Sequence, residues 1–470
     1  MGRFFKGLAK VFGGFVALVV IAVGVIWMLP THTQEVTIDF TRHLSDHVQS
    51  EDVAMAEPET FFGAAGSARM IVTGMGEGAS ATITLNGDVV ASPDNFTAGA
   101  FEVPVELVAD DNIMTIALDG TPDTGVNVRI KQVQHLQMHV MSRIHFNTNV
   151  SNFSESHEFY KSLGFQTASD FPKANTVAMA RSMGIYELTK YDGSKGGEPG
   201  GYLLDGRIMN LGGFGNGNID LISYEIPARE GAPYAKLNHL GMARATMPTT
   251  DIQADYKYLT GIGVNFLAPP MQRADGKMFA TFTDLDGTFY ELLEVEDTDE
   301  DSDNGVSNIT GVAQVLINVS DYERSRAWYQ MMGYEEDHKL PSSESAAVAQ
   351  AMGFDGPIEI DGGWMTGTND KSTLEIVQWI TPYDGAAPYP VPINHLGIAR
   401  MAFATADIEA DVATLKAQGV KFVSLITPCC SGNDSSSSIV AFYDPDGTIM
   451  ELAGFPGMDK LFPILQFFAD

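Results

Sequence analysis

The sequence is poor in cysteine and in basic residues, and both shortages exclude classes of protein. Of its 470 residues only Cys429 and Cys430 are cysteines, so no framework of disulfides supports the fold. We interpret these adjacent thiols as incidental loop residues, with a redox-sensitive loop as the alternative. Lysine and arginine together number 28, against 60 aspartates and glutamates. The net charge of −32 excludes a nucleic acid as partner, because its phosphates would be repelled.

Long apolar runs are also scarce, and the one that stands out is Val11–Leu29. It carries no charge, and at about 1.5 Å per residue it is long enough to cross a membrane core of about 30 Å. Arg3, Lys6 and Lys10 precede it, which predicts a cytoplasmic N-terminus. The alternative is a cleaved signal peptide, but a small-residue cleavage site does not follow. We therefore predict a single-pass anchor in the inner (cytoplasmic) membrane over residues 1–33, with the main body periplasmic or otherwise extracytoplasmic.

The rest of the chain divides by its pattern. Residues 34–140 contain β-branched and alternating runs separated by turns, including the Asn86-Gly87 hairpin signal, and predict a small β-sandwich. From residue 141 short strands alternate with single helices, in four similar units. The acidic segment 297–306 fits no EF-hand spacing and is interpreted as a solvated linker. Residues 456–470 form a hydrophobic tail, which either packs on the protein's own core or contacts a partner.

Residues with metal-binding chemistry recur in the same order in two halves. Asn-His-Leu-Gly occurs at 238–241 and again at 394–397, and Asp-Gly-Thr-x-x-Glu-Leu at 286–292 and at 446–452. A duplicated set of imidazole, carboxylate and amide groups on strands indicates a duplicated metal site. The competing interpretation takes each residue alone: a strand histidine is usually a satisfied polar group, and a glutamate at a hairpin end can simply face solvent.

These motifs resemble the vicinal oxygen chelate superfamily, which includes glyoxalase I, extradiol dioxygenases and bleomycin-resistance proteins. The resemblance covers residues 142–454, and its most specific elements are the two Asn-His-Leu-Gly strands and the two Asp-x-Asp-Gly-Thr-x-x-Glu-Leu hairpins. It implies an α+β fold of four βαβββ modules that form two metal-site domains, preceded by the all-β domain and the transmembrane helix. The modules are expected to pair in chain order, as pair A over 141–296 and pair B over 307–455.

The resemblance also implies the ligands. In glyoxalase I the first ligand lies fourteen residues before an aromatic-tyrosine pair, and both His145 and Gln314 stand at that distance from such a pair. The other ligands end later strands. Four carboxylates, Asp220, Glu291, Glu375 and Glu451, are then expected to be catalytic as well. The implied site A is His145, Asp220, His239 and Glu291, and the implied site B is Gln314, Glu375, His395 and Glu451.

The donor types favour an open site for a divalent metal (Ni, Co, Fe, Mn or Zn) rather than a closed structural zinc. Such a metal polarises a substrate carbonyl while a carboxylate moves the proton. Asp220 is one methylene shorter than the usual glutamate, which leaves His145, His239 and Glu291 as a second arrangement. That 2-His-1-carboxylate set is typical of Fe(II) oxygenases.

The leading hypothesis is therefore a membrane-anchored, extracytoplasmic, glyoxalase-like lyase or isomerase that acts on a vicinal-oxygen small molecule. The alternatives are an extradiol-type dioxygenase at site A, and a non-catalytic subunit or binding module of a membrane complex with a membrane-protein partner. Glutathione adducts are not expected as substrates. Asn149 and Asn318 stand where bacterial glyoxalase I has an arginine for the glutathione carboxylate, so the charged anchor is missing.

Overall fold

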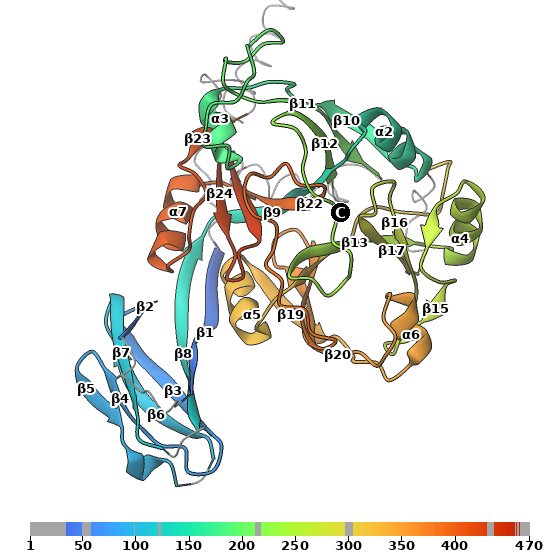
Figure 1. Ribbon diagram of the computed structural model, residues 1–470. Helices are drawn as coiled ribbons and strands as arrows, with labels where there is room; N and C mark the ends of the chain where they lie inside the picture. Colours follow the sequence, from blue (N-terminus) through green and yellow to red (C-terminus); the bar gives the residue numbers. More distant parts are fainter. Residues whose placement is uncertain are drawn as a thin grey trace, which may run out of the picture.

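The structure is a computed structural model of the whole chain. Strands dominate it, and one main helix accompanies each of the four module-like units (Figure 1). The residues that it describes are 34–48, 58–97, 99–120, 124–211, 218–296, 304–429, 437–455, 457 and 460.

The N-terminal domain consists of two four-stranded sheets that enclose their own apolar core, which includes Val72, Ile83 and Val128. Between β4 and β5, Asn86 and Gly87 have φ of 53° and 92°, as a two-residue hairpin turn requires. One sheet has the order β1 (Gln34–Val48), β8 (Gly125–Met138), β3 (Gly66–Met75), β6 (Phe101–Leu107), and the other the order β2 (Glu59–Gly63), β7 (Asp110–Leu118), β4 (Ala81–Leu85), β5 (Asp88–Ala91).

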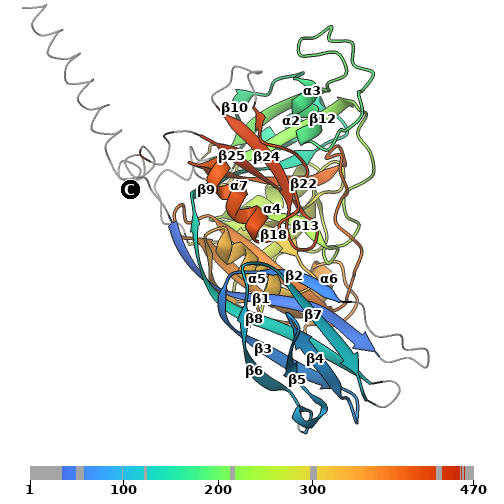
Figure 2. The same cartoon turned by 90° about the vertical axis from the view of Figure 1, so that its left-hand side faces the viewer.

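Strands β1 and β8 pair along nearly their whole length and join this domain to the body (Figures 1 and 2). At the body, β1 lies against α5 (Tyr322–Met331) and β8 against α7 (Ile408–Ala417). His139, which follows β8, is held through its backbone N–H by the Asp411 carboxylate of α7 at 2.8 Å. The small domain is thus attached through both of its long strands.

The body contains an eight-stranded and a nine-stranded sheet, each built from two module-like units. The first has the order β10 (Gln166–Asp170), β11 (Leu203–Asn210), β12 (Asn218–Ile226), β9 (Val140–Asn149), β22 (Gly397–Thr405), β25 (Ile449–Gly454), β24 (Ser438–Tyr443), β23 (Thr427–Pro428). The second has the order β14 (Asn265–Phe266), β16 (Met278–Thr283), β17 (Phe289–Glu294), β13 (Gly241–Thr249), β18 (Gln314–Asn318), β21 (Thr373–Thr381), β20 (Glu359–Gly367), β19 (Tyr334–Lys339), with β15 (Met271–Gln272) beside β16.

Each unit has one main helix with the same N-cap chemistry. The caps Asn152, Asp251, Asp321 and Asp407 each accept a hydrogen bond from the backbone N–H three residues on, which satisfies a donor that the helix itself cannot. The helices are α2 (Phe153–Ser162), α4 (Ile252–Gly261), α5 and α7, and the short helices η1 (Pro93–Asn95), α3 (Val177–Ser182) and α6 (Ala346–Ala351) lie between strands.

The expected pairing of modules in chain order is wrong. Strand β9 of the first module pairs with β22 of the fourth, and β13 of the second module pairs with β18 of the third. Pairing between strand edges is set by long-range packing, which local periodicity does not contain. The connections that enter β13 and β22 pack on each other here, with the rings of Tyr234 and Tyr389 stacked at 4.0 Å.

Three of the segments predicted from the sequence lie wholly or mostly outside the residues that the structure describes. The predicted anchor at 11–29 lies outside the described residues, as do most of the acidic linker 297–306 and of the tail 456–470. Within the described part of the chain, we find no helix whose length and apolar character would let it span a bilayer. Cys429 is disulfide-bonded, so the interpretation of this residue as an incidental thiol is wrong.

Candidate metal centres and active site

Two polar centres form where modules meet, each on four adjacent central strands. The histidine centre lies on β9, β12, β22 and β25, and the arginine centre on β13, β17, β18 and β21. Strand pairing aligns the side chains in rows, because residues at alternate positions share one face of a sheet. The histidine centre comprises His145, Asn147, Asp220, Arg400 and Glu451, and the arginine centre comprises Arg244, Arg273, Glu291, Gln314 and Glu375.

In the histidine centre an imidazole and two carboxylates converge. His145 Nε2 lies 3.2 Å from Asp220 Oδ2 and 4.0 Å from Glu451 Oε1. The Arg400 guanidinium holds the other side of this group, donating from Nη1 to Glu451 Oε2 and from Nε to Asn147 Oδ1 at 2.7 Å. Asp220 has no exposed surface, and Arg400 and Glu451 are almost as deeply buried.

Four atoms at the histidine centre are buried without a hydrogen-bond partner: His145 Nε2, both oxygens of Asp220 and the amide Nδ2 of Asn147. The contact between His145 and Asp220 is close, but it is not aligned as a hydrogen bond. More than nine in ten buried polar groups in proteins are paired, so an orphaned cluster of this kind requires an explanation such as a ligand. The unpaired atoms therefore point to a binding site.

Burial also changes the ionisation of this group. Burial, and secondly the Arg400 charge, lower the pKa of His145 to about 3, so its imidazole is neutral. Burial raises the pKa of Asp220 to about 8 against the attraction of Arg400, and it raises the pKa of Glu451 in the same way. At neutral pH Asp220 therefore retains a proton unless a cation replaces it.

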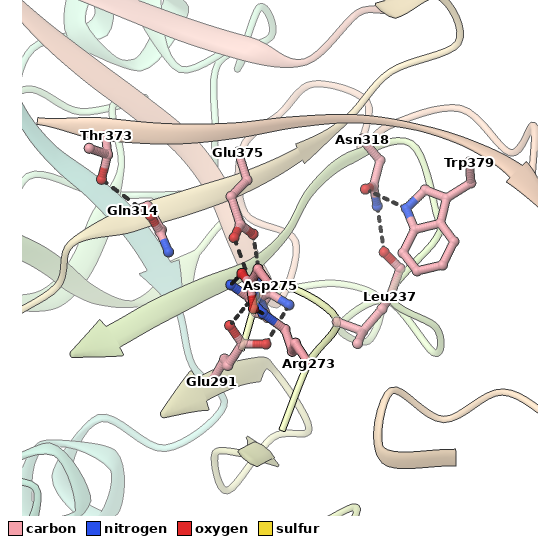
Figure 3. Close-up of polar contacts among 10 residues, drawn as sticks. Leu237, Arg273, Asp275, Glu291, Gln314, Asn318, Thr373, Glu375 and Trp379 are labelled. Carbon is pink, nitrogen blue, oxygen red and sulfur yellow. Dashed lines mark hydrogen bonds and ion pairs between the residues drawn. The ribbon is translucent and has the colours of Figure 1, made fainter. Parts of the chain in front are cut away.

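The arginine centre is occupied by side chains of opposite charge (Figure 3). Arg244 donates to Glu291 at 2.8 Å and also to Glu375. Arg273 reaches in from the loop between β15 and β16 and donates to Glu291 at 3.4 Å, while Asp275 holds its other side at 2.8 Å. Burial alone would lower the pKa of Arg273, but Glu291 and Glu375 raise it above its usual value. The Arg273 guanidinium is therefore charged.

The remaining member of the arginine centre, Gln314, presents a donor rather than a ligand. Its carbonyl oxygen accepts a hydrogen bond from the Thr373 hydroxyl at 3.3 Å, as Figure 3 shows, and its amide Nε2 has no partner. An amide NH₂ group does not coordinate a cation.

The sequence prediction placed His239 and His395 at the metal, and the structure contradicts this. His239 precedes β13 and stacks on Tyr234 at 4.1 Å, and His395 precedes β22 and stacks on Tyr389 at 5.3 Å. With the Tyr234–Tyr389 stack, the four rings form one column between the halves. The side chains that reach the carboxylates are Arg244 and Arg400, five residues further along each strand.

The implied ligand sets A and B are also regrouped by the module pairing. His145 and Asp220 meet Glu451 rather than Glu291, and Gln314 and Glu375 meet Glu291 rather than Glu451. The 2-His-1-carboxylate arrangement of His145, His239 and Glu291 is therefore not formed. Sequence reasoning missed both arginines, although their repetition in a Gly-x-Ala-Arg pattern at 241–244 and 397–400 was a usable signal.

Asn149 and Asn318, which stand where bacterial glyoxalase I has an arginine, donate hydrogen bonds to backbone carbonyl oxygens. Asn149 donates to the carbonyl oxygen of His395 at 2.8 Å, and Asn318 to that of His239 at 2.7 Å. In Figure 3, Asn318 also contacts Leu237 and accepts from the Trp379 indole at 2.8 Å. Both amides therefore fix the connections that enter β13 and β22.

The two centres differ in their fit to a divalent metal. As they stand, the described residues contain no group of three or more His, Cys, Asp or Glu side chains arranged to hold a metal ion. The histidine centre nevertheless offers a neutral imidazole and two carboxylates, with three unpaired atoms, and this donor set suits such a cation. The arginine centre does not fit, because guanidinium groups already bind its carboxylates.

Comparison with known proteins defines the class. Residues 142–292 and 311–452 each match the Glyoxalase/Bleomycin resistance protein/Dioxygenase superfamily. The chain belongs to this superfamily, as the two motif sets predicted. A search of curated proteins found no match to this chain.

Among solved structures, glyoxalase I from Zea mays is similar over 69% of this chain and 95% of its own, with 17% identity and a TM-score of 0.44. A putative dioxygenase from Bacillus subtilis is similar over 68% of this chain and 86% of its own, with 14% identity and a TM-score of 0.44. Membership of the superfamily rests on the two matched segments and not on these likenesses.

Proposed function

We propose that the chain is a metal-dependent enzyme of the vicinal oxygen chelate type and that the histidine centre is its active site. The observation that carries this proposal is the set of unpaired buried atoms on His145 and Asp220. His145, Asp220 and Glu451 would hold the cation, in place of the four-residue sets inferred from the motifs. When bound, a divalent metal supplies a Lewis acid for two neighbouring substrate oxygens.

The chain's own residues supply the proton transfer. A bound cation would replace the proton of Asp220, so the group that remains to move a proton is Glu451, whose pKa is raised by burial. Glu451 has one oxygen turned toward His145 and the other held by Arg400. Arg400 is thus a positioning residue for Glu451. This arrangement supports a lyase or isomerase that moves a proton between adjacent carbons of a small vicinal-oxygen substrate.

The test is metal content of the full chain, measured by elemental analysis after reconstitution with Ni²⁺, Co²⁺, Mn²⁺, Fe²⁺ or Zn²⁺ in turn. Wild-type protein should bind one equivalent of at least one of these ions, and Asp220→Asn should lose it. Glu291→Gln, in the arginine centre, is the matched control and should retain the metal. Wild-type protein without metal under all five conditions would refute the proposal and favour a non-catalytic subunit of a membrane complex.

We further propose that the segment 11–29 anchors the protein in the cytoplasmic membrane with the body outside the cytoplasm. The support is the length of this uncharged run and the basic residues before it. An enzyme in that position would meet its small-molecule substrate in the periplasm or an equivalent space.

A further inference from the structure

We infer that the arginine centre takes no metal and that Arg244 and Arg273 replace the cation, closing the second and third modules with an internal ionic clasp. The clasp is defined by Arg244, Arg273, Glu291 and Glu375. The inference does not depend on the function proposed for the histidine centre.

The charges of the clasp balance within the protein. Each carboxylate faces both guanidinium groups: Glu291 lies 2.8 Å from Arg244 and 3.4 Å from Arg273, and Glu375 contacts Arg244 and lies 3.7 Å from Arg273. Two carboxylates and two guanidinium groups therefore alternate around one point, and Asp275 pairs with the outer side of Arg273 at 2.8 Å. A divalent cation placed there would be repelled by two fixed positive charges at short range, and both carboxylates already face those guanidinium groups.

The clasp is buried, so water and salt screen it little. The side chains of Arg244, Glu291 and Glu375 are exposed by 4%, 0% and 3%. Buried charges of this kind persist only when they are paired, and here they are paired across modules. Arg244 lies on β13 and Glu291 on β17 in the second module, whereas Glu375 lies on β21 in the third. The clasp thus reinforces the β13–β18 pairing that joins these modules.

The loop that carries Arg273 is fixed over the centre. The Arg273 backbone N–H donates to the Lys277 carbonyl oxygen at 2.9 Å, which closes the turn between β15 and β16. Lys277 Nζ then lies 4.5 Å from the ring centroid of Trp364, on strand β20 of the third module. Figure 3 shows Arg273 between the two glutamates. The second module therefore brings its own guanidinium to the place where a ligand-bound cation would sit.

Among the residues that the structure describes, none brings a second guanidinium to the histidine centre, which explains why the two centres differ. Strands β15 and β23 occupy corresponding places beside β16 and β24, and the residue that matches Arg273 after β23 is Cys429. His145 stands in the position of Gln314. One centre thus has one arginine and a neutral imidazole, and the other has two arginines and no imidazole.

The first experiment compares metal content and thermal stability in full-length protein. Glu375→Gln should leave the Ni²⁺ content equal to that of wild type and should lower Tm, because one charge of the clasp is lost. A loss of one Ni²⁺ equivalent in Glu375→Gln would show that the arginine centre binds metal and would overturn the inference.

The second experiment seeks a gain. The double variant R244H/R273M removes both guanidinium groups and supplies an imidazole beside Glu291 and Glu375, so it should bind one Ni²⁺ more than wild type. R244H alone is the matched control and should gain none, because Arg273 still fills the centre. A folded double variant, judged by circular dichroism, that gains no Ni²⁺ would refute the role of the arginines. The gain is expected even if wild-type protein binds no metal, so failure of the proposed function is distinguishable.

Discussion

The buried contact between Arg400 and Glu451 should be worth several kcal/mol in metal-free protein. Both side chains are almost fully buried, at 3% and 4% exposure, and they are in direct hydrogen-bond contact. Removing one partner of a buried ion pair costs about 3–5 kcal/mol, because the other charge is left uncompensated. We therefore expect Arg400→Met to lower the free energy of unfolding by about that amount, while the double variant R400M/E451Q costs far less than the sum of the singles.

The assay is a double-mutant cycle measured by urea unfolding in the presence of EDTA, followed by circular dichroism. The expected coupling between the two positions is at least about 2 kcal/mol. The exposed pair Lys173–Asp205, at 2.9 Å but with side chains 56% and 34% exposed, is the control and should show a coupling below about 1 kcal/mol. Additive effects at Arg400 and Glu451, within about 0.5 kcal/mol, would refute the assignment of a buried, charge-balanced pair.

Three further predictions concern other parts of the molecule. Burial raises the pKa of Asp444 from 3.8 to about 7 in the folded protein. The protonated carboxyl therefore favours the folded state. Its contribution to the free energy of unfolding is complete below pH 3.8 and is lost as the pH rises through 7. Between pH 4 and pH 8 the free energy of unfolding of Asp444→Asn should therefore decrease by up to about 4 kcal/mol less than that of wild type. An unchanged pH profile of the unfolding free energy would contradict burial as the cause. Gly241→Ala should lower Tm more than Gly287→Ala. Both positions have positive φ, but only the new Cβ at position 241 would lie against the Tyr234 hydroxyl, at 2.8 Å. Equal melting temperatures would show that Tyr234 can move aside at little cost. Removal of residues 1–33 should move the protein from the membrane fraction to the soluble fraction on centrifugation, and retention in the membrane would locate the anchor elsewhere.

The sequence was sufficient to predict which strands carry the polar groups. His145, Asp220, Gln314 and Glu375 lie on β9, β12, β18 and β21, and His145 meets Asp220, the carboxylate expected from its own module. These assignments succeeded because strand and helix periodicity is local. The partner module could not be predicted in the same way, because it depends on strands such as β9 and β22 that are some 250 residues apart.

The two arginines were missed for a different reason. Strand β13 is buried on both faces, so no polar alternation marks the side that faces the centre. The Asn-His-Leu-Gly motif lies just before the strand and drew the ligand assignment to His239. A single arginine, Arg244, in an otherwise uncharged buried strand was the stronger indication, because a buried charge requires a partner.

Because β9 pairs with β22 and β13 with β18, each half of the body depends on the other to complete its sheets. Each half alone would present two bare strand edges, β9 and β13 in the first and β18 and β22 in the second, and neither polar centre would be complete. The peptide link between the halves therefore acts chiefly by raising the effective concentration of one half beside the other. If that link were cut, the same four modules would form a complementing pair of fragments. Their assembly would then depend on dilution, which the intact chain escapes.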